Sequence, residues 1–177
     1  MIHTNTYANR IDWDRVTYDS AEKFVPPISY GKVVKVYDGD TITVATTLDN
    51  TRAPVYRFPV RLRGIDSPEI RGKEKQEVIV AMVARDALAA KVLNQMVFLQ
   101  NIDTEKYGRV LADVYLEEHK SGSGSGKPEK QSISEWMLEN HYAVAYNGGA
   151  KSFSHLSLLH GKEQETEEDA YYKIGTW

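Results

Sequence analysis

Residues 30–47 read YGKVVKVYDGDTITVATT, and this stretch carries the strongest structural signal in the chain. Val, Ile, Thr and Tyr dominate residues 30–37 and 41–47, which is typical of β-strands. Asp38-Gly39 lies between these two runs and is a strong signal for a tight turn. The stretch therefore predicts a β-hairpin at the start of a mainly β domain.

The rest of the chain predicts further strands and helices in a recognisable order. Three more strands are expected at 55–65, 97–102 and 109–117. Three helices are expected at 77–93, from Ser132 or Ser134 to Asn140, and from about Leu156 to Lys173. Five short strands with helices between and after them fit an α+β, mainly β fold. This fold is a five-stranded OB-fold Greek-key barrel with three helices packed against it.

Pro26-Pro27 blocks a regular element and marks a division of the chain. We interpret residues 1–27 as an N-terminal extension packed on the domain, and residues 28–177 as a single domain. The sequence SGSGSG at 121–126 predicts a flexible loop over 118–131. A chain of 177 residues is long enough for one such domain to bury a core without covalent cross-links.

The composition excludes several classes of protein. The chain contains no cysteine, which excludes disulfides, thiolate metal sites and a cysteine nucleophile. Its longest apolar run, at 78–84, is far shorter than the ~20 residues of a membrane helix. The N-terminus shows no secretory signal. We therefore expect an intracellular protein without membrane association, or a secreted one from which a leader has been removed.

Charge is unevenly distributed along the chain. The formal net charge of −3 does not by itself suggest a nucleic-acid-binding protein. Residues 52–75, however, hold seven Lys and Arg against three Asp and Glu, a local charge of +4. Such a segment fits a phosphate-binding site or a solvated strand face followed by a loop. Charge alone favours the solvated face.

Three acidic residues, Asp40, Asp66 and Glu69, each lie at a turn that follows a predicted strand. Asp40 and Asp66 are 26 positions apart, so we expect pairing of the first and third strands to bring them together. Two carboxylates with a backbone carbonyl and waters suit a hard cation such as Ca²⁺. The absence of histidine from this cluster argues against zinc. Taken singly, each of these acids is more often structural than functional.

Two arginines could face the same site. Arg61 lies five residues before Asp66, and odd and even positions of a regular strand face opposite ways. Both side chains can serve one site only if the strand bends, and Gly64 between them predicts such an irregularity. Arg109 follows Tyr107-Gly108 and could approach the same anion, although in isolation it fits a surface arginine after a hairpin.

Together these features resemble the staphylococcal nuclease family, whose fold is an OB barrel with three helices. The resemblance rests on VVKVYDGDT at 33–41, VRLRGIDSPE at 60–69 and KYGRVLA at 106–112. Residues 138–146 and the terminal GTW are also similar to the end of family members, so the resemblance covers about 30–177.

The resemblance implies a Ca²⁺-dependent nuclease acting on DNA, RNA or both. Water attacks phosphorus in this family and the 5′-oxygen leaves, which gives 3′-phosphate ends. The resemblance implies that Ca²⁺ is held by Asp40, Asp66 and the main-chain carbonyl of Ser67, and that Asp38 lies close to the metal without ligating it. It implies that Glu69 orients or deprotonates the attacking water and that Arg61 and Arg109 bind the phosphate. It also implies that Tyr107 and Tyr146 contact the nucleotide.

Two other classes of function stay open from the sequence. One is a non-catalytic nuclease-like OB domain that binds nucleic acid or protein, as in degenerate domains fused to Tudor domains. Such domains have generally lost the acids and arginines of the site, whereas this chain retains all five, which favours the enzyme. The other is an OB barrel that binds oligosaccharide or protein through its strand face. We expect a monomer without an obligate protein partner.

Overall fold

The structure is a computed structural model that describes residues 11–48, 54–72, 75–105, 107–118 and 129–148. In chain order its elements are η1 (Trp13–Arg15), β1 (Tyr30–Asp38), β2 (Thr41–Thr47), β3 (Val55–Leu62), β4 (Ile65–Asp66), α1 (Lys75–Val92), β5 (Met96–Thr104), β6 (Val110–Glu118), β7 (Glu129–Ser132), α2 (Ile133–Glu139) and β8 (Val144–Ala145). No helix within these ranges is long and apolar enough to cross a membrane.

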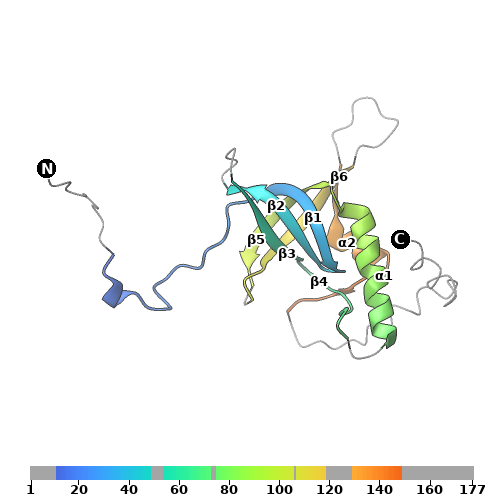
Figure 1. Cartoon of the computed structure of the whole chain (residues 1–177), viewed down its shortest axis with the longest axis horizontal. Helices are drawn as coiled ribbons and strands as arrows, with labels where there is room; N and C mark the ends of the chain where they lie inside the picture. Colours follow the sequence, from blue (N-terminus) through green and yellow to red (C-terminus); the bar gives the residue numbers. More distant parts are fainter. Residues whose placement is uncertain (1–10, 49–53, 73–74, 106, 119–128, 149–177) are drawn as a thin grey trace, which may run out of the picture.

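Five strands close into a mixed β-barrel (Figure 1). The strand order is β3-β2-β1-β5-β6, with antiparallel neighbours, and β7 extends the sheet beyond β6. A parallel pairing of β3 with β6 closes the barrel and places Val60 opposite Val110. The predicted mainly β barrel is therefore confirmed, with α1 and α2 as its helices in the described part of the chain. The third predicted helix, at 156–173, lies outside the described residues.

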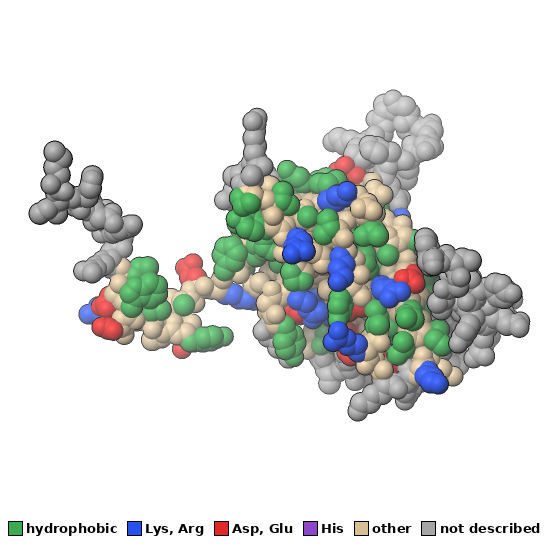
Figure 2. Space-filling view, viewed as in Figure 1, with side chains coloured by type: hydrophobic (Ala, Val, Ile, Leu, Met, Phe, Trp, Pro, Cys, Tyr) green, Lys and Arg blue, Asp and Glu red, His purple; other side chains and the backbone are tan. Residues whose placement is uncertain are grey.

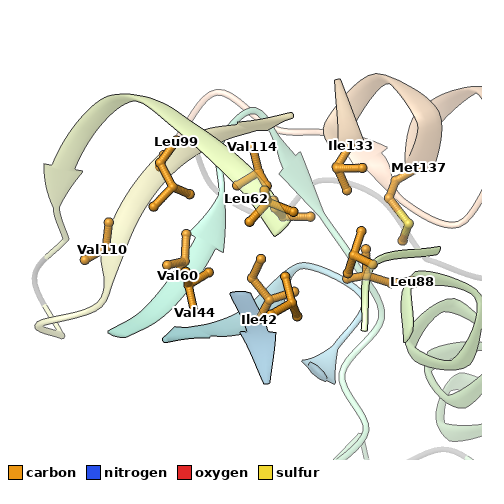
Figure 3. Close-up of a cluster of buried hydrophobic side chains, with 14 of the residues drawn as sticks. Ile42, Val44, Val60, Leu62, Leu88, Leu99, Val110, Val114, Ile133 and Met137 are labelled. Atoms are coloured by element: carbon orange, nitrogen blue, oxygen red, sulfur yellow. The ribbon is translucent and has the colours of Figure 1, made fainter. Parts of the chain in front are cut away.

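The core forms because alternate strand residues point into the barrel. Ile42 and Val44 on β2 and Val60 on β3 have no exposed surface. Leu88 of α1 and Met137 of α2 belong to the same buried cluster and are also completely buried. Figure 3 shows these two helix residues on one side of the cluster and the barrel residues beside them. Packing of both helices on the strands therefore makes one continuous core.

The third predicted strand, over 55–65, is interrupted. β3 ends at Leu62 and β4 begins at Ile65, and Gly64 between them has a φ of +82°. A residue with a side chain rarely adopts this left-handed conformation, whereas glycine does so readily. The expected irregularity near Gly64 is therefore confirmed, and it divides the strand expected over 55–65 into β3 and β4.

The predicted loop over 118–131 is shorter than expected. Glu129 to Ser132 form β7, which pairs with β6 through Tyr115 opposite Ser132 and Leu116 opposite Gln131. Glu118 also still belongs to β6. These residues carry polar side chains that give little strand signal, and the partner strand decides their conformation. Residues 119–128, which contain the SGSGSG sequence, lie outside the described residues.

In its described part, residues 11–27, the N-terminal extension contacts the barrel near its end. Residues 11–25 are exposed, and Figure 1 shows this segment running away from the barrel. Near the end of this segment, Lys23 forms an ion pair with Asp103 at 2.8 Å, and the Thr104 hydroxyl donates a hydrogen bond to the Phe24 carbonyl at 3.1 Å. The expectation that the extension packs on the domain is therefore wrong for residues 11–22.

Candidate active site

The turn between β1 and β2 places Asp40 beside the end of β3. The Asp38 carboxylate accepts a hydrogen bond from the Asp40 amide at 3.2 Å, which stabilises the turn. The Asp40 carbonyl accepts a hydrogen bond from the Leu62 amide at 2.8 Å. We expected the first and third strands to pair directly, and this was wrong because β2 lies between β1 and β3. Thr41 and Arg61 form the first pair of the β2–β3 ladder, and the turn lies just beyond this pair, beside the end of β3.

Gly39 allows this turn to approach its neighbours closely. A Cβ atom at residue 39 would lie 2.8 Å from the Cβ of Ser67 and 2.9 Å from the Cβ of Ala84. Such distances are shorter than van der Waals contact, so a larger residue would push the turn away from Ser67 and from α1. The glycine therefore positions the following Asp40 against the segment that carries Ser67.

The break at Gly64 brings Asp66 to the same place. β4 leaves the barrel and pairs with β8, with Asp66 opposite Val144. The Arg61 guanidinium then contacts two carboxylates, with Nη1 at 2.8 Å from Asp40 Oδ2 and Nη2 at 2.8 Å from Asp66 Oδ1. The planar fork of arginine suits this arrangement, because two of its nitrogens can each donate to a different acid. Arg61 thus joins two carboxylates that come from distant parts of the sequence.

Both carboxylates are buried: Asp40 is 2% exposed and Asp66 is 4% exposed. The pKa of Asp40 is raised from 3.8 to about 7, chiefly because the carboxyl group is buried and also because the Asp38 carboxylate is near, while Arg61 and the Thr41 hydroxyl act in the opposite direction. The Asp40 carboxylate also accepts hydrogen bonds from the Thr41 hydroxyl at 2.8 Å and the Ser67 amide at 3.2 Å. The pKa is raised despite these partners because burial removes the ionised carboxylate from water.

The oxygen donors of this site fit a hard divalent cation such as Ca²⁺. Two buried carboxylates and main-chain carbonyls are the ligands that Ca²⁺ prefers, and a cation would stabilise the ionised form of Asp40. Throughout the part of the chain that the structure describes, no group of three or more His, Asp or Glu side chains is arranged to hold a metal ion. Main-chain oxygens and waters would therefore have to complete the coordination.

The raised pKa of Asp40 gives a prediction for the pH dependence of stability. Since the folded protein binds this proton more tightly than the unfolded chain, the contribution of Asp40 to the free energy of unfolding falls as pH rises from about 4 to about 7. We expect urea denaturation in EDTA to show this decline for the unmodified protein and a smaller decline for Asp40→Asn. At pH 8, Ca²⁺ should stabilise the unmodified protein and have little effect on the variant. Equal pH dependence of the two proteins would contradict the prediction.

Arg109 reaches the Asp40 carboxylate through Thr41. Its Nη1 donates to the Thr41 hydroxyl at 3.2 Å, and that hydroxyl donates to Asp40. Its Nε pairs with Glu105, which holds the guanidinium in this orientation. The pairing of β6 with β3 explains why Arg109 lies close to Thr41. Val110 lies opposite Val60, and Arg109, the residue before Val110, borders the cavity.

The predicted site residues come together around one cavity of about 560 Å³. Seven of them border it: Asp38, Asp40, Arg61, Asp66, Ser67, Glu69 and Arg109. Glu69 is exposed on the loop that follows β4. Tyr107 and Tyr146 are not among the lining residues; Tyr107 is 73% exposed, and the Tyr146 amide donates to the Gly64 carbonyl at 2.9 Å. The two tyrosines therefore lie outside the lining of the cavity.

Sequence reasoning missed several residues of the site. Lys35, Tyr37, Arg71 and Arg85 also border the cavity. Arg71 lies in the basic segment 52–75, which was a signal for its location, whereas nothing in the sequence indicated that Arg85 of α1 faces the site. Thr41 and Glu105 orient Arg109, and only the fold shows that they do so.

Comparison with known proteins gives consistent matches. The family described as "Staphylococcal nuclease homologue" matches residues 59–177. Protein ParB from Escherichia coli is 33% identical over 149 residues, which are 83% of this chain and 71% of that protein. Micrococcal nuclease from Shigella flexneri is 28% identical over 147 residues, 83% of this chain and 72% of that protein. An uncharacterized endonuclease from Escherichia coli is 28% identical over 117 residues, 66% of this chain and 61% of that protein.

The family match begins within β3 and includes β4, the loop that carries Glu69, and the start of β6. It thus contains most of the residues that border the cavity, and the barrel is of the kind expected for that family. This chain belongs to the family of staphylococcal nuclease homologues.

Proposed function

We propose that this protein is a Ca²⁺-dependent nuclease that hydrolyses phosphodiester bonds of DNA, RNA or both. The observation that carries the proposal is the convergence of two buried carboxylates, two arginines and Glu69 on a single cavity. Two relatives whose names describe a nuclease and an endonuclease support it. We further propose that residues 28–177 form the nuclease domain and that the protein acts as a monomer.

In this proposal Asp40, Asp66 and the main-chain carbonyl of Ser67 hold Ca²⁺. When bound, Ca²⁺ would supply positive charge that offsets the negative charge developing on the phosphate oxygens. Asp38 does not ligate the metal and instead holds the turn that positions Asp40. The negative charge of Asp38 raises the pKa of Asp40, so a cation close to both carboxylates would stabilise the ionised form of Asp40.

Arg61 and Arg109 bind the scissile phosphate. Guanidinium groups bind phosphate oxygens through paired hydrogen bonds, and the transition state of phosphodiester hydrolysis carries more negative charge than the ground state. Carboxylates hold both arginines in place: Asp40 and Asp66 contact Arg61, and Glu105 contacts Arg109. Because these contacts restrict the guanidinium groups before substrate arrives, little reorganisation is needed when phosphate binds.

Glu69 orients or deprotonates the water that attacks phosphorus. Glu69 is exposed yet borders the cavity, so it can accept a proton from a water inside the site. The P–O5′ bond then breaks and the leaving 5′-oxygen takes a proton from solvent, which gives a 3′-phosphate on one product and a 5′-hydroxyl on the other. Tyr107 and Tyr146 contact the nucleotide outside the cavity.

Metal-dependent digestion tests the proposal. The purified protein is incubated with heat-denatured DNA, or with RNA, in Ca²⁺ or in EDTA, and the products are separated on a gel. We expect cleavage in Ca²⁺, none in EDTA, and products whose 3′ ends lose phosphate on treatment with a phosphatase. The absence of cleavage in Ca²⁺, or equal cleavage in EDTA, would refute the proposal. Binding of DNA without cleavage would instead support a non-catalytic domain.

A further inference from the structure

Strand β1 carries an irregularity that changes which of its side chains face the cavity. The register of β1 against β2 shifts between Val33 and Lys35 and again between Val36 and Asp38. Val33 and Val36 are the inward residues on either side of the first shift. They are three positions apart, whereas successive inward residues of a regular strand are two positions apart. Such a bulge re-aims all the side chains that follow it. Val34 and Lys35 are consequently both exposed.

Without this bulge, Lys35 and Tyr37 would point into the barrel, because Gly31 and Val33 are buried and strand residues alternate between faces. In the structure both side chains are exposed and both border the cavity. Tyr37 is 48% exposed, and the Lys35 ammonium lies 5.8 Å from the centre of its ring. The bulge therefore presents an aromatic ring and an adjacent cation on the outer surface beside the acidic centre.

Two arginines extend this surface. Arg71 is exposed on the loop after Glu69, and Arg85 projects from α1. The Arg85 guanidinium pairs at 2.7 Å with the carboxylate of Asp86, its neighbour in the chain, which is 62% exposed. An exposed pair of this kind contributes little free energy, so a phosphate can replace the carboxylate at small cost. Figure 2 shows Lys and Arg side chains following one another over the face that carries β1, with hydrophobic side chains between them.

We propose that Lys35, Tyr37, Arg71 and Arg85 form a subsite for the nucleotide next to the scissile phosphate in single-stranded nucleic acid. This inference rests on the proposed nuclease function. Tyr37 offers a ring on which an unpaired base can stack, and the cations bind the phosphate that follows the scissile one. The subsite lies on the β1 and α1 side of the cavity and is separate from Tyr107 and Tyr146, which do not border it.

The chemistry of these residues favours a single strand over a duplex. A tyrosine ring can stack only on a base whose own face is uncovered, and the bases of a duplex are covered by their neighbours. The cations carry no information about base identity, because phosphates are the same at every position. The subsite should therefore increase affinity for longer single-stranded substrates without adding sequence preference.

Binding of a fluorescent 12-nucleotide single-stranded DNA in Ca²⁺ tests the subsite. All proteins carry Glu69→Gln to slow cleavage, and the dissociation constant is measured at several salt concentrations. We expect Tyr37→Ala to weaken binding about 5- to 100-fold. We expect Lys35→Gln and Arg71→Gln each to weaken binding and to reduce the slope of log affinity against log salt by about 0.7.

Lys32→Gln is the matched control. Lys32 is an exposed lysine on the same strand, but it precedes the bulge and is not among the residues that border the cavity. Nearly unchanged DNA affinity of Lys32→Gln, together with weaker DNA binding by the Lys35 and Tyr37 variants, would support the subsite. Equal effects of Lys32→Gln and Lys35→Gln, or undiminished binding by Tyr37→Ala, would overturn it.

A second measurement separates this inference from the proposed function. Cleavage of a dinucleotide and of the 12-nucleotide strand in Ca²⁺ is compared for proteins that retain Glu69. A dinucleotide lacks the phosphate that follows the scissile one, so we expect Lys35→Gln to reduce kcat/KM several-fold more for the longer substrate. Equal losses of kcat/KM for both substrates would overturn the subsite. Cleavage by the unmodified protein would in that case still support the nuclease proposal. Absence of cleavage by the unmodified protein would refute the nuclease proposal, and the binding measurements would still decide the subsite.

Discussion

Replacing Arg61 with glutamine is expected to reduce the rate of DNA cleavage by on the order of 10³-fold. The guanidinium of Arg61 is directed at the cavity, and a unit charge about 4 Å from the phosphate contributes roughly 4 kcal/mol at an effective dielectric constant near 20. Arg61→Lys should recover only part of the rate, because an ammonium group lacks the fork that contacts Asp40 and Asp66 at once. Initial rates on heat-denatured DNA in saturating Ca²⁺ measure both effects.

Arg57→Gln is the control for this experiment. Arg57 is exposed on β3, four residues before Arg61 on the same face of the strand, and it is not among the residues that border the cavity. Its replacement removes the same charge and should leave the rate within about twofold. Urea denaturation in Ca²⁺ verifies that Arg61→Gln remains folded, because removing one partner of a buried ion pair destabilises proteins. Equal rates for the folded Arg57 and Arg61 variants would rule out a role of Arg61 in phosphate binding.

Replacing Glu69 with glutamine is expected to reduce the cleavage rate by roughly 10²- to 10⁴-fold. The amide has nearly the same shape as the carboxylate but cannot accept a proton from water. Glu69 is exposed and is not one of the proposed Ca²⁺ ligands, so the variant should fold and should bind DNA and Ca²⁺ as the unmodified protein does. The measurements are single-turnover cleavage and, separately, DNA binding.

Glu139→Gln gives the matched comparison for Glu69→Gln. Glu139 is exposed at the end of α2 and is not among the residues that border the cavity. Unchanged cleavage by this control together with slow cleavage and normal binding by Glu69→Gln would assign the loss to the chemical step. A Glu69 variant that cleaves at the full rate would show that another group activates the water.

Local features of the fold could be predicted because their causes lie within a few residues. Asp38-Gly39 predicted the turn between β1 and β2, and Gly64 predicted the break after β3. Both predictions rest on conformations that depend on the residue itself and its immediate neighbours. The polar strand β7 could not be predicted in this way, since pairing with β6 stabilises it.

The pairing of distant segments could not be predicted from the residues. We expected Asp40 and Asp66 to meet through pairing of the first and third strands, but β2 lies between them and the turn itself reaches β3. The two acids were nevertheless correctly expected to be close, since one arginine contacts both. The resemblance and the break at Gly64 indicated that the two acids lie close together. They did not indicate the path of the chain that brings the two acids together.

The sequence by itself determined the class of fold, the turn that carries Asp40, the break that turns Asp66 toward Arg61, and seven of the residues that border the cavity. Short-range sterics and residue type are sufficient for these features. Only the tertiary structure decided that Arg61 bridges two buried acids and that a bulge in β1 turns Lys35 and Tyr37 outward to the cavity rim. The register of a strand and the burial of a charge depend on partners distant in sequence, so no short segment contains that information.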